Sequence, residues 1–127
     1  MSKPSKVGVV IIVVVVACLG VLAIEAQTKI VRRAYDNFVL DNENHYLPCE
    51  KLPTEAEVRR IAQEYRDVIQ SMEQVNPGFV GVDIDTTRCP GKADIIVWYA
   101  SHRDRVAIAR IIGGETFFGV PYRLQNR

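Results

Sequence analysis

An uninterrupted apolar segment near the N-terminus constrains this chain more than any other feature. The eighteen residues from Val7 to Ile24 contain no charged residue, amide or proline, and only Gly8, Cys18 and Gly20 interrupt a run of Val, Ile, Leu and Ala. A helix rises ~1.5 Å per residue, so the segment covers ~27 Å, close to the hydrocarbon thickness of a bilayer. The segment therefore predicts a membrane-spanning helix and places the rest of the chain beside a lipid bilayer.

Three interpretations of this segment stay open. Lys3 and Lys6 before the apolar run are typical both of an uncleaved signal anchor and of a cleaved signal peptide. The run is longer than a usual signal-peptide core, which favours the anchor, although the small residues Ala23 and Ala26 would suit cleavage. A four-residue stretch ending in Cys18 resembles a lipobox, but mostly apolar residues follow it, where a lipoprotein turns polar.

Cysteine usage favours an extracytoplasmic location for the part of the chain after the apolar segment. The lysines before the run favour a cytoplasmic N-terminus, whereas the basic residues at 29–33 favour the opposite orientation. Because Cys18 lies inside the apolar run, Cys49 and Cys89 are left as an even pair, which suits an oxidising compartment. We therefore predict a single-pass protein of the cell membrane, with its C-terminal part outside and a Cys49–Cys89 disulfide.

Charge is balanced over the part of the chain that follows the apolar segment. Of the 16 Lys and Arg residues only Lys3 and Lys6 precede Glu25, which leaves 14 against all 15 Asp and Glu residues. Nucleic-acid-binding proteins carry a basic stripe with interleaved aromatic residues, and no such stripe is visible in this sequence. The composition therefore argues against a nucleic-acid partner.

The pattern divides the chain into a membrane anchor at 1–24, an amphipathic helical stalk and loop at 25–47, and a small extracytoplasmic domain at 48–127. In the stalk, apolar residues recur at spacings of three and four, which is typical of an amphipathic helix that can continue the membrane helix. Its apolar face rests on the domain or on lipid headgroups, or packs against a partner helix. The residues that we expect to form this interaction surface are Ile30, Val31, Tyr35, Phe38 and Val39.

The remaining sequence predicts an α+β domain. A capping box at Thr54 and Glu57 begins a long helix. Alternation near the C-terminus predicts a strand with Phe118 on the core face and Phe117 exposed, and Pro121 indicates that this strand lies at a sheet edge or ends there. We expect two layers in the order α-β-β-α-β, with the helices on one face of a three-stranded sheet. The predicted elements are a helix over 54–75, strands over 79–85 and 93–99, a helix over 101–112 and a strand over 116–122.

Candidate catalytic and metal-binding groups are few. Asp83 and Asp85 share one face of a predicted strand, where paired carboxylates could bind Ca²⁺ or act as acid and base, but such alternation also marks a solvated face. His45 and His102 could join the two cysteines in a tetrahedral zinc site, but their spacing is not that of zinc fingers. We therefore expect no catalytic residue, no metal and no cofactor.

Two resemblances indicate an assembly protein. The element order behind one membrane helix resembles the ring-building modules of secretion and sporulation membrane complexes. The sequence Lys6-Val7-Gly8 is similar to a prepilin cleavage site, although Val13 stands where pilins carry glutamate. We expect a non-catalytic accessory or structural subunit that docks to an integral membrane protein complex or self-assembles as a homo-oligomer. The alternatives are a pilin-like or ring-forming subunit, and a membrane-tethered hydrolase or metal-binding enzyme that uses Asp83, Asp85 or His102.

Overall fold

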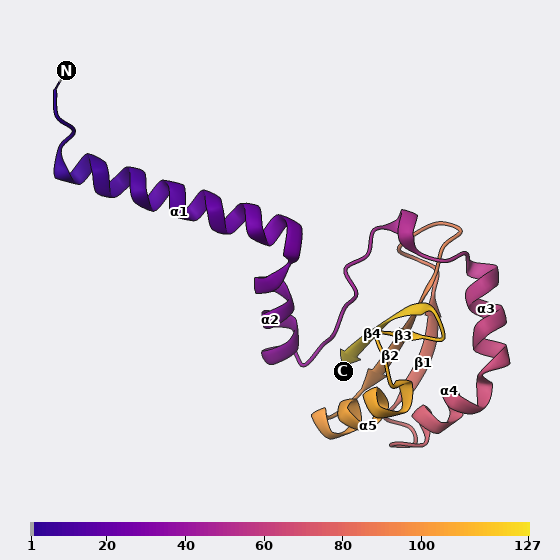
Figure 1. The fold of residues 1–127 in the computed structure, drawn as a ribbon. Coiled ribbons are helices and arrows are strands. Elements are labelled where there is room, and N and C mark those ends of the chain that lie inside the picture. The colour runs from indigo at the N-terminus through magenta and orange to yellow at the C-terminus, as the bar shows by residue number, and fades with distance from the viewer. Residues whose placement is uncertain (1) are drawn as a thin grey trace.

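The computed structural model describes residues 2–127, and its N-terminal apolar segment forms one long helix that stands apart from the domain. Helix α1 spans Lys6–Thr28, and the Ser5 hydroxyl caps it by accepting a hydrogen bond from the Gly8 amide at 3.1 Å. No residue of α1 is buried. The helix extends away from the folded domain (Figure 1). Among the described residues, α1 is the helix that is long and apolar enough to cross a bilayer, so it is a possible single membrane span.

A sharp break separates α1 from the amphipathic helix α2, Ile30–Phe38. Lys29 adopts a left-handed conformation with φ 55°, which ends α1, and α2 starts at the next residue in a different direction (Figure 1). The Glu25 carboxylate accepts hydrogen bonds from the amides of Val31 and Arg32, at 2.7 and 3.0 Å, and so caps α2. The stalk helix is therefore a separate element and does not continue α1, because a left-handed residue interrupts the helical hydrogen bonding.

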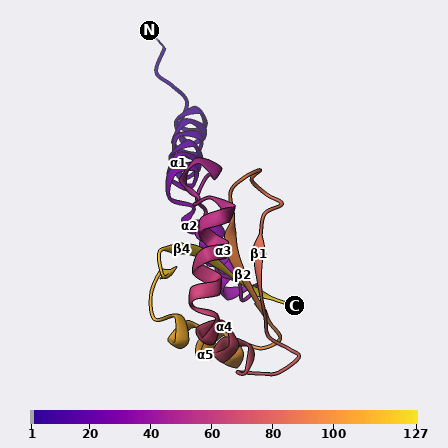
Figure 2. The ribbon, with the colours of Figure 1, turned by 90° about the vertical axis from the view of Figure 1, so that its right-hand side faces the viewer.

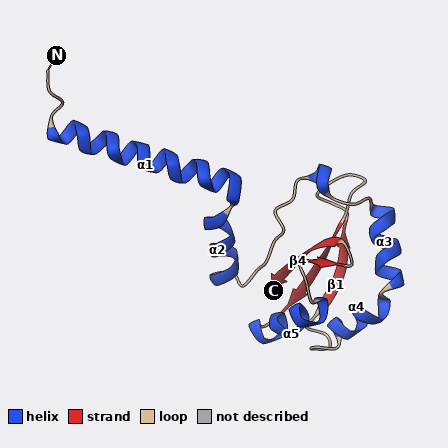
Figure 3. Cartoon of the chain, viewed as in Figure 1, coloured by secondary structure: helices blue, strands red, loops and turns tan. Residues whose placement is uncertain are grey.

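The domain contains a four-stranded mixed sheet. The strand order is β1 (Gly81–Asp85), β2 (Asp94–Tyr99), β4 (Val120–Asn126) and β3 (Thr116–Phe117) (Figures 1 and 3). Strands β1 and β2 are antiparallel, β2 and β4 are parallel, and β3 and β4 are antiparallel. The predicted α+β class is confirmed, whereas the prediction of three strands is wrong.

The additional strand arises because the sequence at 116–122 folds into a hairpin. Phe118 and Gly119 both have positive φ, 49° and 89°, as in a two-residue type I′ turn. The turn reverses which aromatic ring is buried, so the expectation for these two residues is wrong. Phe117 is 1% exposed, whereas Phe118 is 48% exposed and stacks on Tyr65.

Pro121 does not mark a sheet edge. Strand β4 lies between β2 and β3, and its pairing with β2 begins at Tyr122, so Pro121 interrupts no pairing with β2. The edge strands are β1 and β3, and the predicted edge position near Pro121 is wrong.

The long predicted helix is divided in two. Helix α3 spans Glu55–Glu64 and α4 spans Arg66–Glu73, with a break at Tyr65, where φ is −107° and ψ is 35°. The Thr54 hydroxyl caps α3 by accepting a hydrogen bond from the Glu57 amide at 3.3 Å, as the capping box predicts. A straight helix of the predicted length would extend ~30 Å, further than the strands that it covers. The break lets α4 turn along the end of the sheet, where it contacts β1 and α5.

Helix α5, His102–Ile112, connects the parallel strands β2 and β4. The Ser101 hydroxyl caps it by accepting a hydrogen bond from the Asp104 amide, and Gly113 ends it with φ 73°. Helices α3, α4 and α5 pack against one face of the sheet, here called the first face, and share one hydrophobic core with it. Figure 2 views the domain from the side of α3. The core consists of Val58, Ile61, Met72, Val80, Ala93, Ile95, Val97, Tyr99, Ile108, Phe117, Val120, Tyr122 and Leu124.

The second face of the sheet, opposite these helices, carries the side chains that alternate with the core positions. On β2 they are Asp94, Ile96 and Trp98. The Trp98 ring lies over Gly81 of the neighbouring strand, where a Cβ atom would stand 1.9 Å from the indole. Position 81 must therefore be glycine, because any side chain would collide with the Trp98 ring. The Arg127 guanidinium lies 5.7 Å from the centre of the same ring.

Candidate functional site

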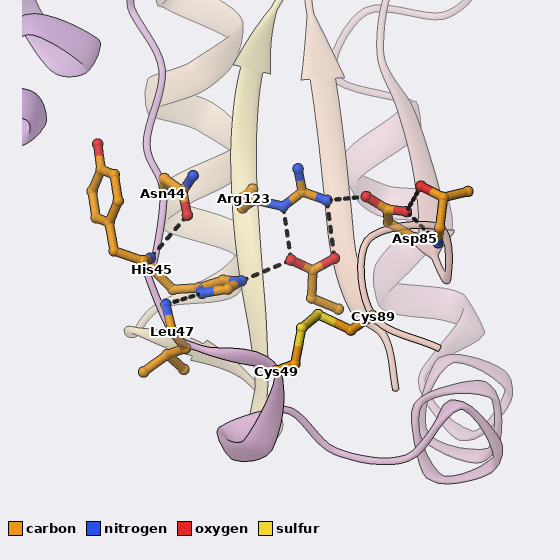
Figure 4. A network of polar contacts seen from close by, with 10 residues as sticks. Asn44, His45, Leu47, Cys49, Asp85, Cys89 and Arg123 are labelled. Atoms are coloured by element: carbon orange, nitrogen blue, oxygen red, sulfur yellow. Dashed lines mark hydrogen bonds and ion pairs between the residues drawn. A yellow bond between two sulfur atoms is a disulfide. The ribbon is translucent and has the colours of Figure 1, made fainter. Parts of the chain in front are cut away.

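A network of charged side chains lies at one end of the second sheet face, where residues 39–48, the linker between α2 and the 3₁₀ helix η1 (Cys49–Lys51), run alongside β4 (Figure 4). Arg123 of β4 donates from Nε and Nη2 to the two carboxylate oxygens of Asp94 of β2, at 2.7 and 3.0 Å. Its Nη2 also donates to Asp85 of β1 at 2.5 Å. One guanidinium therefore connects carboxylates on two neighbouring strands.

This network is buried and ionised. Asp94 is 2% exposed, and the side chains of Arg123 and Asp85 are also largely buried. Burial by itself raises the pKa of Asp94, but hydrogen bonds from His45 and Arg123, together with the charge of Arg123, hold that pKa below its usual value. Burial likewise raises the pKa of Asp85, and hydrogen bonds from Thr87 and Arg123 outweigh it, so this pKa is also lowered.

The linker residue His45 completes the network. Its Nε2 lies 2.7 Å from Oδ2 of Asp94, and its Nδ1 lies 2.9 Å from the backbone nitrogen of Leu47. A backbone amide can only donate, so Nδ1 is the acceptor and Nε2 carries the proton that is shared with Asp94. Both ring nitrogens are occupied, which leaves His45 no nitrogen with which to bind a metal or a substrate.

A second network joins α2 and the linker to α5 and β2 around Asp41. The Asp41 carboxylate accepts a hydrogen bond from Nη1 of Arg105 at 2.8 Å and pairs with Nδ1 of His102 at 2.7 Å. Its backbone carbonyl accepts a hydrogen bond from the buried Tyr99 hydroxyl. Arg105 also donates to the Asn37 side chain of α2 at 2.5 Å. Burial raises the pKa of Asp41, but the hydrogen bonds from His102 and Arg105 hold it below its usual value.

The linker also extends the sheet along β4. Glu43 and Leu124 exchange both backbone hydrogen bonds, at 2.8 and 2.9 Å, as an isolated antiparallel bridge. The Asn42 side chain accepts a hydrogen bond from the Asn126 amide at 2.7 Å. These backbone contacts hold the linker against the sheet between the two charged networks.

The polar side of α2 faces the linker through Tyr46. The guanidinium groups of Arg32 and Arg33 lie 5.6 and 5.1 Å from the centre of the Tyr46 ring. The Tyr46 hydroxyl donates to the Asp36 carboxylate, and burial together with this carboxylate raises the pKa of Tyr46 to about 12. The charged side of α2 is therefore turned toward the domain.

Replacing Arg105 with methionine is expected to detach α2 and the linker while the domain stays folded. The variant removes the donors that join Asn37 and Asp41 to α5, so amide exchange at residues 37–46 should accelerate by an order of magnitude or more. The amides of β2 should keep their protection. Hydrogen exchange followed by mass spectrometry measures both, with Arg103→Met, an exposed position on the same helix, as the control. Equal acceleration in both segments would instead mean that Arg105 stabilises the whole domain.

The predicted Cys49–Cys89 disulfide is confirmed. It links η1 to the loop between β1 and β2, with Cα atoms 5.5 Å apart (Figure 4). Because the cysteines are bonded to each other, the alternative zinc site with His45 and His102 is not formed. The disulfide indicates an oxidising, extracytoplasmic location for the domain.

The other candidate groups are not gathered at one place. Asp83 and Asp85 share a sheet face as predicted, but Asp85 binds Arg123 and Thr87, whereas Asp83 is exposed. His102 belongs to the separate Asp41 network. Within residues 2–127, no group of three or more His, Cys, Asp or Glu side chains is arranged to hold a metal ion.

An open cavity of about 410 Å³ lies between α2 and the linker. It is lined by polar groups that include Arg33 and Arg105, and none of Asp83, Asp85 and His102 takes part in it. Of the residues that were expected to form an interaction surface on α2, Phe38 lines this cavity, whereas Ile30, Val31, Tyr35 and Val39 do not. Ile30, Val31, Tyr35, Phe38 and Val39 are between 55% and 83% exposed.

Sequence reasoning missed the central residues of both networks. The sequence does contain a signal that Arg105 is buried. Arg105 stands three residues before Ile108 and seven before Ile112, and this spacing places it on the buried face of its helix. Arg123 offered no such signal, since an arginine that alternates with core residues in a strand is read as solvent-exposed. Comparison with protein-family models, curated protein sequences and solved structures finds no match for this chain.

Proposed function

We propose that this chain is a non-catalytic accessory or structural subunit of the cell membrane. In this proposal α1 anchors the chain, and the extracytoplasmic domain docks to a larger integral membrane protein complex or assembles with other copies. The observation that carries the proposal is that the buried ionisable side chains bind one another and hold parts of the chain together. Arg123, Asp94 and His45 fasten the linker to the sheet, and Arg105 with Asp41 fastens α2 to the domain. General acid–base catalysis needs a group that can exchange a proton with a substrate, and these groups are engaged by their neighbours.

A tethered hydrolase or metal enzyme is the main alternative. It would use Asp83, Asp85 or His102, and one cavity lined by these groups would favour it. Instead, Asp83 is exposed, Asp85 belongs to the Arg123 network and His102 belongs to the Asp41 network. This separation supports the non-catalytic proposal. A pilin-like or ring-forming subunit is a form of the same proposal in which the partner is a second copy of this chain.

Extraction from native membranes with a mild detergent, followed by native electrophoresis and mass spectrometry, tests the proposal. We expect a discrete complex larger than the 14.3 kDa chain, containing an integral membrane protein or several copies of this chain. A photo-crosslinking residue in place of Asp83 should join the chain to that component, because the half-buried Ile96 and Trp98 lie beside it on the helix-free face. The matched control replaces Gln63, an exposed residue of α3 on the opposite layer. A single 14.3 kDa species without crosslinks from either position would contradict the proposal.

A further inference from the structure

We propose that α2 lies flat in the interfacial layer of the bilayer, with its apolar face among the lipid headgroups and upper acyl chains and its polar face bound to the domain. This proposal rests on the proposed function in one respect, namely that α1 spans the membrane. Amphipathic helices with a basic polar side and large apolar residues on the other side bind membranes in this way.

The apolar face of α2 points away from its own domain. In a water-soluble protein an amphipathic helix packs its apolar face against the core and exposes its polar face. Here the polar side makes the contacts, since Asn37 bonds to Arg105 and Asp36 bonds to Tyr46. The side chains on the opposite side remain uncovered, with exposed fractions of 58% for Ile30, 61% for Val31, 55% for Tyr35 and 83% for Phe38.

The position of α2 identifies the bilayer as the occupant of this face. Only Lys29 separates α2 from α1, and Figure 1 shows α1 and the folded domain on opposite sides of α2. Because the side of α2 toward the domain is polar, its apolar side points toward the side from which α1 arrives. The nine residues of α2 extend ~13 Å, so the whole helix stays close to the bilayer surface when it runs across the axis of α1. The apolar surface of α1 therefore continues into that of α2.

A basic residue at the junction of α1 and α2 fits a lipid headgroup layer. Lys29 takes part in no ion pair within the described residues, and such a cation attracts anionic headgroups. Tyr35 is half-exposed on the apolar side, and aromatic rings with a polar tip favour the level of the headgroups. With Arg105 holding Asn37, insertion of α2 would fix the orientation of the domain over the membrane.

Spin labels in the full-length protein test this placement after reconstitution into vesicles of phosphatidylcholine with a minor fraction of phosphatidylglycerol. The labels are attached to Val31→Cys and Phe38→Cys in a Cys18→Ala background, in which the Cys49–Cys89 disulfide stays oxidised. Both positions are exposed, so the substitutions remove no contact of the folded domain. Gln63→Cys in the same background, at an exposed position of α3 away from the proposed docking face, is the control for water exposure, and the label on native Cys18 is the control for the bilayer core.

We expect the labels at 31 and 38 to collide with oxygen, and to collide with a water-soluble nickel complex on the order of tenfold less often than the label at 63. Equal nickel access at 31, 38 and 63, with Cys18 protected, would overturn the interfacial placement and leave the membrane anchor intact. Protection of 31 and 38 from both reagents, with dipolar broadening between labels, would overturn it in favour of contact with a second copy. Nickel access at Cys18 would overturn the membrane span itself.

Discussion

Replacement of Arg123 with methionine is expected to lower the free energy of unfolding of the domain by about 3–5 kcal/mol, because it leaves the buried Asp94 without its counter-charge. Asp85 loses the same partner. Urea denaturation followed by the fluorescence of the single tryptophan, Trp98, measures the loss. Arg60→Met is the matched control, since it breaks only an exposed pair with Glu64 at 3.1 Å and should cost ~0.5 kcal/mol or less.

The pH dependence distinguishes loss of charge pairing from loss of packing. The pKa values of Asp85 and Asp94 are lower in the folded protein than in the unfolded chain. Their contribution to stability is therefore present above the unfolded-state pKa and is lost as the pH falls through the folded-state values, which places the loss below about pH 5. The free energies of unfolding of the wild type and of Arg123→Met should consequently converge in acid. A stability difference that stays constant with pH would show that Arg123 acts through packing alone.

Opening the Cys49–Cys89 disulfide is expected to cost about 4 kcal/mol on the chain-entropy model, because the bond closes a loop with a sequence separation of 40 residues. Such a loss is a large fraction of the stability of a small domain, so the Cys49→Ala/Cys89→Ala variant should unfold at a markedly lower temperature than the wild type. Thermal unfolding measured by circular dichroism, with and without reductant, tests the expectation.

Two controls accompany the disulfide experiment. Cys18→Ala should unfold like the wild type, because Cys18 is an exposed residue of α1 outside the domain. Reductant should have no effect on the double alanine variant. A loss below about 1 kcal/mol on reduction would mean that the reduced chain keeps the same loop closed, and the chain-entropy account would then fail.

The chain between α2 and the domain is fastened at three successive points. Arg105 holds Asn37 and Asp41, Asp94 holds His45, and the disulfide holds Cys49. Flexible linkers between membrane helices and domains need no such contacts. The contacts instead suit a domain whose position relative to α2 matters, as both the proposed accessory role and the interfacial placement of α2 require.

Local patterns in the sequence predicted most of the helices and strands and the disulfide. The apolar run predicts α1, the capping box at Thr54 predicts the start of α3, and period-two alternation or a continuous apolar run predicts β1 and β2. The even pair Cys49 and Cys89 predicts the disulfide. These signals succeed because each depends on residues within a few positions of one another, or on a chemical pairing with one possible partner.

Tertiary structure alone decided how these elements meet. The break at Tyr65 and the turn at Phe118 follow from the length of the sheet and from the packing of aromatic rings between distant segments. The pairing of Arg123 with Asp94, and of Arg105 with Asp41, depends on strand register and on the path of the linker, for which the sequence carries no local signal. The helical period predicts that α2 has an apolar face, but which side of α2 meets the domain depends on these long-range polar contacts.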